Sequence, residues 1–421
     1  MLRVLVLALL AVAVLASCQS SPMTNEDTSG KGKGTSVDSL DEGLVEANTR
    51  FAFNLFDEVW TEKPDANLFI SPPSVSIALT MTYNGAAEET RTAMADALQI
   101  TGTDLDALNR SYAGLISLLE NPDSNVDLSI ANSLWAREGL PFKEDFLQRN
   151  RDYFHARIEE LDFNASDAAP TINGWVNDQT RGKINAIVDD PIDPSLIMFL
   201  INAIYFKGTW TTEFPDSLTE DQSFTLADGR RIDHPLMHQS DMYQYLKGDD
   251  FQAVSLPYSS GRISMYVFLP DRESDLTAFL SRLDEPTWKQ WMTSFGEREG
   301  TVALPRFKLE YSTELKKALT ALGMGVAFSE SGADFSNMFP IGPGANVYIS
   351  KVKHKSFVEV NEKGTEAAAV TSVEIGITSI GPNEIQPFYM TVDRPFFFAI
   401  RDNRTGVILF MGAIFDPSQE S

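Results

Sequence analysis

The chain has 421 residues, is 43% hydrophobic, and carries 34 basic against 59 acidic side chains, a formal net charge of −25. The acidic excess argues against nucleic acid as a partner, because a phosphate backbone needs a basic surface. It is spread along the chain, as is typical of a solvated surface adapted either to a saline habitat or simply for solubility. Cys18 is the single cysteine, so no disulfide framework stabilises the fold.

The N-terminus has the pattern of an export signal. Arg3 precedes an apolar run from Val4 to Ala16, which is too short to span a bilayer but suits a secretory signal peptide. The following Leu-Ala-Ser-Cys18 resembles a bacterial lipobox, in which the cysteine thiol receives the lipid. We therefore expect a lipoprotein signal peptide over residues 1–17 and lipidation of Cys18. An ordinary secretory signal with an incidental thiol is the alternative.

A tether follows the signal. Residues 18–43 are rich in Ser, Gly, Thr and Asp and have few large apolar side chains, so they cannot form a core and should act as a flexible tether to a membrane. Gln19 is not aspartate, so by resemblance to Gram-negative lipoproteins the protein should reach the outer membrane or cell surface. The remaining residues, 44–421, contain no linker or repeat and predict a single domain.

Helical patterns dominate the first half of this domain. Apolar residues recur at helical spacing in the first predicted helix, at Leu44, Ala47, Phe51, Leu55 and Val59. Further helices are predicted over residues 74–86, over 88–98, over 172–187 with a break near Gly182, and from a cap at Thr313 to Gly323.

Strand patterns dominate the second half. Residues 200–206 and 263–269 are almost wholly apolar, as is typical of strands covered on both faces, and Pro270 ends the second. Residues 396–400 and 407–414 predict a buried hairpin. Helices early and strands late favour an α+β fold over an alternating α/β fold.

The sequence offers few candidate catalytic or metal-binding residues. The four histidines are His155, His234, His238 and His354. His234 and His238 have a zinc-pair spacing, but Pro235 disfavours a helix there and nothing nearby completes a tetrahedral set. The chain has no nucleophile-elbow or P-loop motif. The sequence therefore predicts no enzyme, no metal and no cofactor.

One segment, residues 362–379, looks like a strand without a partner. Its side chains alternate with period 2 between Gly364 and Gly376, which predicts a half-buried strand. One face is small or apolar: Thr365, Ala367, Ala369, Thr371, Val373, Ile375 and Ile377. Its alanine-rich first half is unusual for a strand. The segment is either an alanine-rich surface loop or a strand that inserts late into a narrow gap.

Six motifs in order favour the second alternative. They are Asn67-Leu-Phe-Ile-Ser71-Pro-Pro-Ser74, Leu200-Ile-Asn202-Ala-Ile-Tyr-Phe-Lys-Gly208-Thr-Trp210, Leu304-Pro-Arg-Phe-Lys-Leu-Glu310, Gly332-Ala-Asp-Phe-Ser336, Val347–Ala369 and Met390-Thr-Val-Asp-Arg-Pro-Phe-Phe-Phe398. Together they resemble the serpin family from about residue 46 to residue 417.

The resemblance implies a serpin-like domain with a large, mostly antiparallel central sheet, additional sheets, eight or nine helices and a reactive loop at about residues 362–394. It implies a monomeric suicide inhibitor that forms a covalent acyl complex with a target serine protease. The hinge of the loop would be Glu362, Gly364, Thr365, Glu366, Ala367, Ala368 and Ala369. The residues that govern opening of the sheet would be Ser71, Ser74, Asn202, Trp210 and His354. A non-inhibitory serpin-fold lipoprotein that binds or chaperones another molecule is the alternative.

Counting as in the family places the scissile bond at Thr378–Ser379. Residues 380–394 exceed the usual length, so the bond can also lie one or two residues away. No Lys or Arg occurs from Gly364 to Asp393, and no large apolar side chain that chymotrypsin prefers occurs before Phe388. The small and β-branched residues near the bond favour elastase-like or subtilisin-like proteases, with a glutamyl-specific protease as a minor option.

Overall fold

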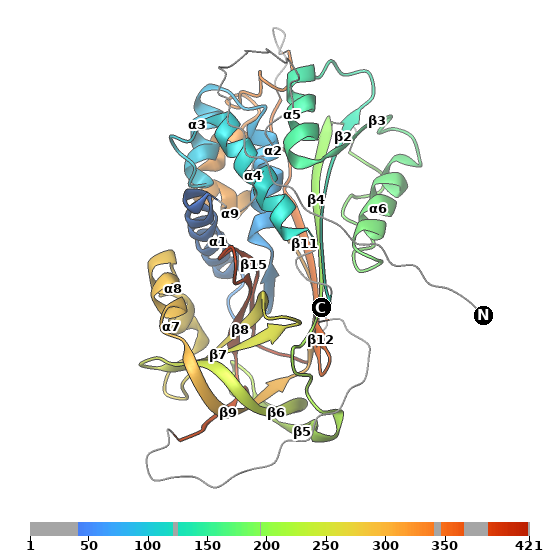
Figure 1. Cartoon of the computed structure of the whole chain (residues 1–421). Helices are drawn as coiled ribbons and strands as arrows, with labels where there is room; N and C mark the ends of the chain where they lie inside the picture. Colours follow the sequence, from blue (N-terminus) through green and yellow to red (C-terminus); the bar gives the residue numbers. More distant parts are fainter. Residues whose placement is uncertain (1–40, 121–124, 194, 341–346, 366–385, 420–421) are drawn as a thin grey trace, which may run out of the picture. The chain divides into compact units, whose positions relative to one another are not determined.

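Figure 1 presents a computed structural model that describes residues 41–419 apart from 121–124, 194, 341–346 and 366–385. The chain divides into two units, Met1–Ser36 and Val37–Ser421, and all described residues belong to the second. The predicted signal peptide, Cys18 and most of the tether lie outside the described residues. Among the described residues, no helix has the length and apolar character needed to cross a membrane.

The described residues form nine α-helices, most of them early in the chain. Their bounds are α1 Glu42–Glu62, α2 Pro72–Tyr83, α3 Glu88–Ala97, α4 Leu105–Leu119, α5 Glu144–Phe154, α6 Ala168–Gln179, α7 Leu276–Leu280, α8 Glu285–Met292 and α9 Lys316–Ala321. Asp41 caps α1 by accepting a hydrogen bond from the Gly43 amide at 2.8 Å. The predicted apolar positions of this helix are all buried.

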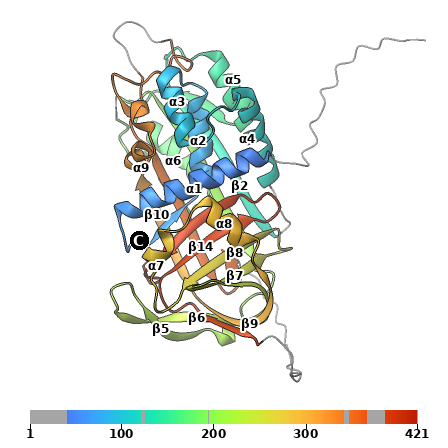
Figure 2. The same ribbon diagram turned by 90° about the vertical axis from the view of Figure 1, so that its left-hand side faces the viewer.

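The strands form two sheets (Figure 2). The larger sheet runs β1 (Leu68–Ile70), β15 (Ile408–Ile414), β14 (Phe396–Asp402), β8 (Ile263–Pro270), β7 (Phe251–Tyr258), β6 (Arg231–Lys247), β9 (Gly296–Pro305) and β13 (Phe388–Thr391), with β5 (Glu220–Thr225) paired to β6. The second sheet runs β10 (Phe307–Glu314), β11 (Lys353–Asn361), β12 (Gly364–Thr365), β4 (Met198–Thr209), β2 (Val126–Arg137) and β3 (Arg157–Leu161). All pairs are antiparallel except β2–β3 and β9–β13.

The second sheet is covered on both faces. Side chains of β4 alternate between two cores: Ile204 and Phe206 join the main core, whereas Ile201 and Ala203 pack in a smaller core with α6. Figure 1 shows α6 beside β2, β3 and β4, on the opposite side from α2. Both predictions, the doubly covered strand and the α+β class, are confirmed.

Two sequence predictions were wrong. Thr313 does not cap a helix, because it pairs with His354 in the β10–β11 ladder and α9 begins only at Lys316. The carboxylate of Glu314 accepts the hydrogen bond from the Lys316 amide instead, at 3.0 Å. The helix predicted over residues 172–187 is interrupted near Gly182 as expected, because Arg181 and Gly182 have φ of +50° and +82°, outside the helical region. However, α6 ends at Gln179, and no helix resumes between Gly182 and Ile187.

Candidate functional site

The second sheet has a slot between β4 and β11. Each of these strands is fully paired on its outer edge, β11 with β10 and β4 with β2. On the edges that face each other, both strands pair only with the two residues of β12, at one end. The rest of both edges carries no strand in the part of the chain that the structure describes. The slot therefore has room for one more strand that continues from β12.

Gly364 and Thr365, two of the residues expected to form the hinge, pair with both neighbouring strands and fit the sheet closely. Gly364 has a φ of +144°, and a Cβ at this position would lie 2.0 Å from the Gly208 carbonyl oxygen, so only glycine fits. Thr365 is 2% exposed, and its Oγ1 is 2.8 Å from the hydroxyl of Tyr258. The Tyr258 ring stacks on Trp210 at a centroid distance of 4.4 Å. Burial raises the pKa of Tyr258, so its hydroxyl stays protonated and available as a donor.

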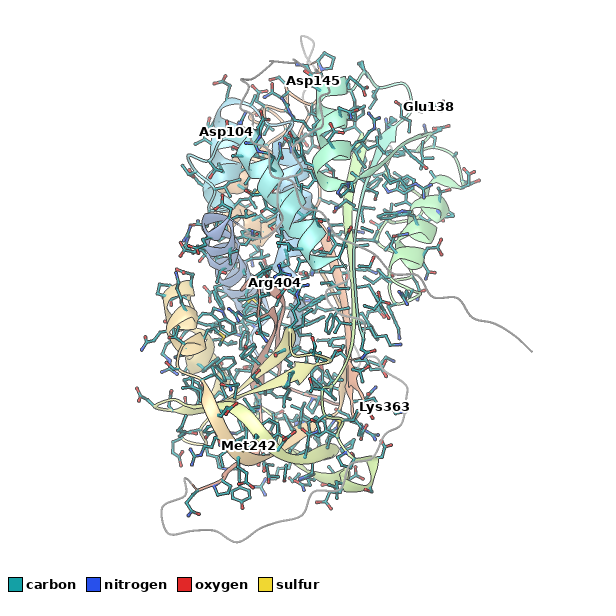
Figure 3. The ribbon with its side chains drawn as sticks, in the orientation of Figure 1. Asp104, Glu138, Asp145, Met242, Lys363 and Arg404 are labelled. Carbon is teal, nitrogen blue, oxygen red and sulfur yellow. The ribbon has the colours of Figure 1, made fainter. Side chains whose placement is uncertain are left out.

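Glu362 anchors the chain just before the hinge. Its carboxylate is 4% exposed and accepts hydrogen bonds from Arg306 Nε at 2.7 and 2.9 Å and from Thr219 Oγ1 at 2.5 Å. Burial alone would raise the pKa of Glu362, but the bonds from Arg306 and Thr219 outweigh it and the pKa is lowered. The Trp210 indole donates to the Asn361 carbonyl at 3.0 Å. Figure 3 labels Lys363, which lies between this anchor and Gly364.

A second polar group lies further along the slot. His354 Nε2 accepts the Ser71 amide at 3.2 Å, and Ser74 Oγ donates to the Asn202 carbonyl at 3.5 Å. Asn202 Nδ2 donates to Asn132 Oδ1 at 2.6 Å, which links β4 to β2. Burial lowers the pKa of His354 to about 4, so its ring is neutral at pH 7 and can accept the Ser71 amide.

The structure thus brings together four of the five residues expected to govern sheet opening. Ser71, Ser74, Asn202 and His354 lie near the middle of β4 and the start of β11. Trp210 lies apart from them, where its indole contacts the hinge end of β11. Of the residues expected to form the hinge, Glu362, Gly364 and Thr365 lie within the described residues. Outside the described residues lie Cys18, Glu366, Ala367, Ala368, Ala369, Thr378 and Ser379.

Sequence reasoning missed four residues that contact these groups. Arg306 and Thr219 bind Glu362, Tyr258 binds Thr365, and Asn132 binds Asn202. Arg306 could have been singled out from the sequence, because it lies in the Leu304–Glu310 motif. The others come from segments that carry no motif, and only the folded chain brings them to the slot.

The segment after α6 is tied to both sides of the slot. Arg181 pairs with Asp127 on β2, and Lys183 lies 3.9 Å from Glu359 on β11. Asp189 pairs with Lys353 at 2.6 Å, where β11 begins. Hydrogen bonding from Lys353 lowers the pKa of Asp189. Because these pairs bridge β2 and β11, a strand that widens the sheet must stretch or break some of them.

The described residues hold no group of three or more histidine, cysteine or acidic side chains that could bind a metal. His234 and His238 lie on β6, not on a helix. His234 Nε2 is 2.6 Å from the Arg306 carbonyl oxygen, and His238 Nε2 is 3.0 Å from Gln222 Nε2. Each histidine therefore already has a protein partner.

Comparison with known proteins decides the family. A family model described as Serpin (serine protease inhibitor) matches residues 46–417. The chain belongs to the serpin family. Serpin B11 of Homo sapiens is 35% identical over 397 residues, which cover 89% of this chain and 99% of the relative. The leukocyte elastase inhibitor of Homo sapiens is 34% identical over 387 residues, covering 89% of this chain and 100% of the relative.

Solved serpin structures match the fold. The thermophilic serpin tengpin in its native state superposes with a TM-score of 0.82 at 32% identity, and the match covers 91% of this chain and 96% of tengpin. The predicted serpin fold, with its mixed α and β content, is therefore confirmed.

Proposed function

We propose that this serpin is a suicide inhibitor of serine proteases that acts by inserting its cleaved loop into the slot between β4 and β11. The observation that carries the proposal is the slot itself, where Gly364 and Thr365, at one end, are the residues paired between β4 and β11 in the described part of the chain. These residues start the segment whose alternating small side chains predict a strand. Similarity to leukocyte elastase inhibitors supports the proposal.

The chemistry is that of an interrupted proteolysis. The serine Oγ of the protease attacks the Thr378 carbonyl carbon and forms an ester, the Thr378–Ser379 peptide bond breaks, and the new amine of Ser379 leaves with the proton from the protease. The loop is then free at Thr378 and can enter the sheet as a strand. The ester carries the protease with it, and distortion of its active site stops hydrolysis of the ester.

The register of β12 predicts where the inserted residues would lie. Gly364 pairs with Thr209, and Thr365 pairs with both Gly208 and Val360. Continued antiparallel pairing would place residue 371 between Asn202 and His354. Thirteen residues from 366 to 378, at about 3.3 Å each, would extend about 43 Å. At about 1 kcal/mol net per new hydrogen bond, insertion would release on the order of 10 kcal/mol.

The loop sequence supports an elastase-like or subtilisin-like target. It lacks the cation that trypsin-like enzymes need and the large apolar side chain that chymotrypsin-like enzymes need near the scissile bond. A glutamyl-specific enzyme cutting after Glu374 is the minor option. The similarity to leukocyte elastase inhibitors supports the first class.

We also propose a lipid anchor on Cys18 that holds the inhibitor in a bacterial cell envelope, at the outer membrane or cell surface, with residues 18–43 as the tether. Several acyl chains at about 0.8 kcal/mol per buried methylene anchor a protein stably. In this place the inhibitor would guard the envelope against foreign or stray proteases. Palmitate labelling of the wild type, but not of Cys18→Ala, tests the anchor. Unlabelled wild-type protein would contradict it.

The inhibitory function is tested by mixing the protein with pancreatic elastase and with subtilisin. We expect a complex that survives SDS, and a C-terminal fragment whose mass places the cut at or within two residues of Thr378. Cleavage by a non-target protease within the loop should raise the heat midpoint of the domain. A cleaved protein that forms no complex and gains no stability would instead indicate a non-inhibitory binding protein.

A further inference from the structure

The slot leads into a cavity that the hinge does not fill. It has a volume of about 460 Å³, and most of its walls come from α2, from the start of β4, from residues 187–197 after α6 (Asp190 and Pro194 apart), and from residues 347–355, which lead into β11. It therefore lies at the opposite end of the slot from Gly364 and Thr365. Pockets that bind small molecules commonly span roughly 300–1,000 Å³, so this one is large enough for a ligand.

The inner wall of the cavity is apolar. Val75, Ala78 and Leu79 line it from α2, and Leu200 lines it from β4. Such a wall suits the hydrocarbon part of a ligand, because most small-molecule pockets are lined mainly by apolar side chains. A ligand that fills the cavity would stabilise the native state by mass action.

The outer rim carries basic side chains, in contrast to the acidic chain as a whole. Lys351, Lys353 and Lys355 line the cavity, against the carboxylates of Asp189 and Asp193. Asp189 is shared between two of these lysines, at 2.6 Å from Lys353 Nζ and 3.8 Å from Lys351 Nζ. Lys355 makes no ion pair with any residue that the structure describes. One positive charge at the rim is therefore left without a counterion.

We infer that this cavity binds a small amphipathic carboxylate, with its apolar chain against α2 and its carboxylate at Lys355. The bound molecule would occupy the half of the slot that residues from about 371 onward need for insertion. It would keep the native state intact and convert the inhibitor into an ordinary substrate, whose ester is hydrolysed before insertion is complete. The second effect rests on the proposed inhibitory function, whereas the binding site does not.

Dodecanoate is a suitable probe, and isothermal titration calorimetry on the intact protein measures its binding without a protease. We expect saturable binding at one site, with a rise in the unfolding midpoint. The Lys355→Gln variant should bind about tenfold more weakly, since one charge-assisted contact is lost. Lys207→Gln changes a lysine of β4 outside the cavity and should leave the affinity unchanged.

Two further arms test the position of the site. Ala78→Phe places a ring in the cavity and should abolish binding while the circular dichroism of the fold is retained. Dodecanol lacks the charge and should bind much more weakly than dodecanoate. The inference is overturned if the wild type does not bind dodecanoate. It is also overturned if the wild type, Lys355→Gln and Ala78→Phe bind dodecanoate equally, because a non-specific detergent would behave in that way.

The regulatory effect is measured as the fraction of protein that ends in the SDS-resistant complex with elastase. Saturating dodecanoate should lower this fraction severalfold and raise the fraction that is merely cleaved, in the wild type but not in Ala78→Phe. An unchanged partition with dodecanoate bound would refute regulation and leave the binding site standing. If no complex forms even without dodecanoate, the proposed function fails, and calorimetry still decides the site.

Discussion

The substitution Thr365→Arg tests the hinge most sharply. Thr365 is 2% exposed between Val360 and Gly208, and its hydroxyl contacts Tyr258. An arginine there would bury an unpaired guanidinium, at an effective cost of several kcal/mol. The native state can avoid this cost by expelling the two residues of β12, but a fully inserted loop cannot. We therefore expect a folded protein that inserts its loop slowly.

The expected slowing of loop insertion follows from the free energy that Thr365→Arg adds to the barrier for insertion. Every 1.36 kcal/mol slows a step tenfold, so a penalty of about 4 kcal/mol slows insertion about a thousandfold. Hydrolysis of the ester then precedes insertion, and the protease turns over the variant as a substrate. The assay is the number of inhibitor molecules consumed per elastase molecule inactivated, with the complex seen on SDS gels.

Matched controls separate the hinge from general damage. Thr365→Ser keeps a small side chain with a hydroxyl and should remain an inhibitor. Glu366→Arg introduces the same charge one residue later, on the face that the alternation predicts to point away from the core, and should be tolerated far better. If Thr365→Arg consumes as few molecules per protease as the wild type, the argument from burial is refuted.

Three other changes have defined outcomes. Arg306→Met removes the counterion of the buried Glu362 carboxylate, which keeps its bond from Thr219, and should cost about 1.5–3 kcal/mol by urea unfolding. Glu362→Gln in the same chain should restore most of that loss; equal loss in both variants would contradict the anchor. The pKa of His354 is lowered to about 4 from an ordinary 6.5, so the folded state resists a proton that the unfolded state binds. The free energy of unfolding should therefore fall, by on the order of 3 kcal/mol at most, as the pH drops from 6.5 toward 4. The His354→Gln variant should show a flatter pH dependence. An equally steep dependence in that variant would contradict the role of His354. Thr378→Arg should create trypsin inhibition where the wild type shows none, as read by complexes on SDS gels, and strong trypsin inhibition by the wild type would refute the assigned specificity.

Local patterns in the sequence predicted much of the fold. The spacing of Leu44, Phe51 and Leu55 predicted α1, because a helix that buries one face repeats its apolar residues with the helical period. The apolar run from Leu200 to Phe206 predicted a strand covered on both faces, and β4 does contribute to two separate cores.

Pairing over long sequence distances was beyond local patterns. Thr313 is of a residue type that often caps helices, yet it pairs with His354 between strands β10 and β11. Glu362 is held by Arg306, which lies 56 residues earlier. Asn132, the partner of Asn202, lies on β2, a strand that the sequence analysis did not predict. Such contacts depend on which strands pair with each other. Strand pairing is set by tertiary packing, which local sequence patterns do not reveal.

The serpin-like motifs singled out Gly364 and the polar residues around His354, because a residue in a motif can be required by the backbone around it. Gly364 illustrates this, since any Cβ there would collide with the Gly208 carbonyl. The cavity beside β4 and β11 carried no such signal, because its walls come from several segments far apart in the sequence.

The central claim is that the cleaved loop becomes a strand between β4 and β11. Hydrogen exchange of peptides covering Met198–Thr209 and Lys353–Asn361, in the intact protein and after cleavage in the loop, tests it directly. In the intact protein, the amides that face the slot beyond β12 should exchange quickly, because no strand of the described residues is paired to them. The account predicts that cleavage protects these amides in both strands together. Unchanged exchange in both strands after complete cleavage would contradict it.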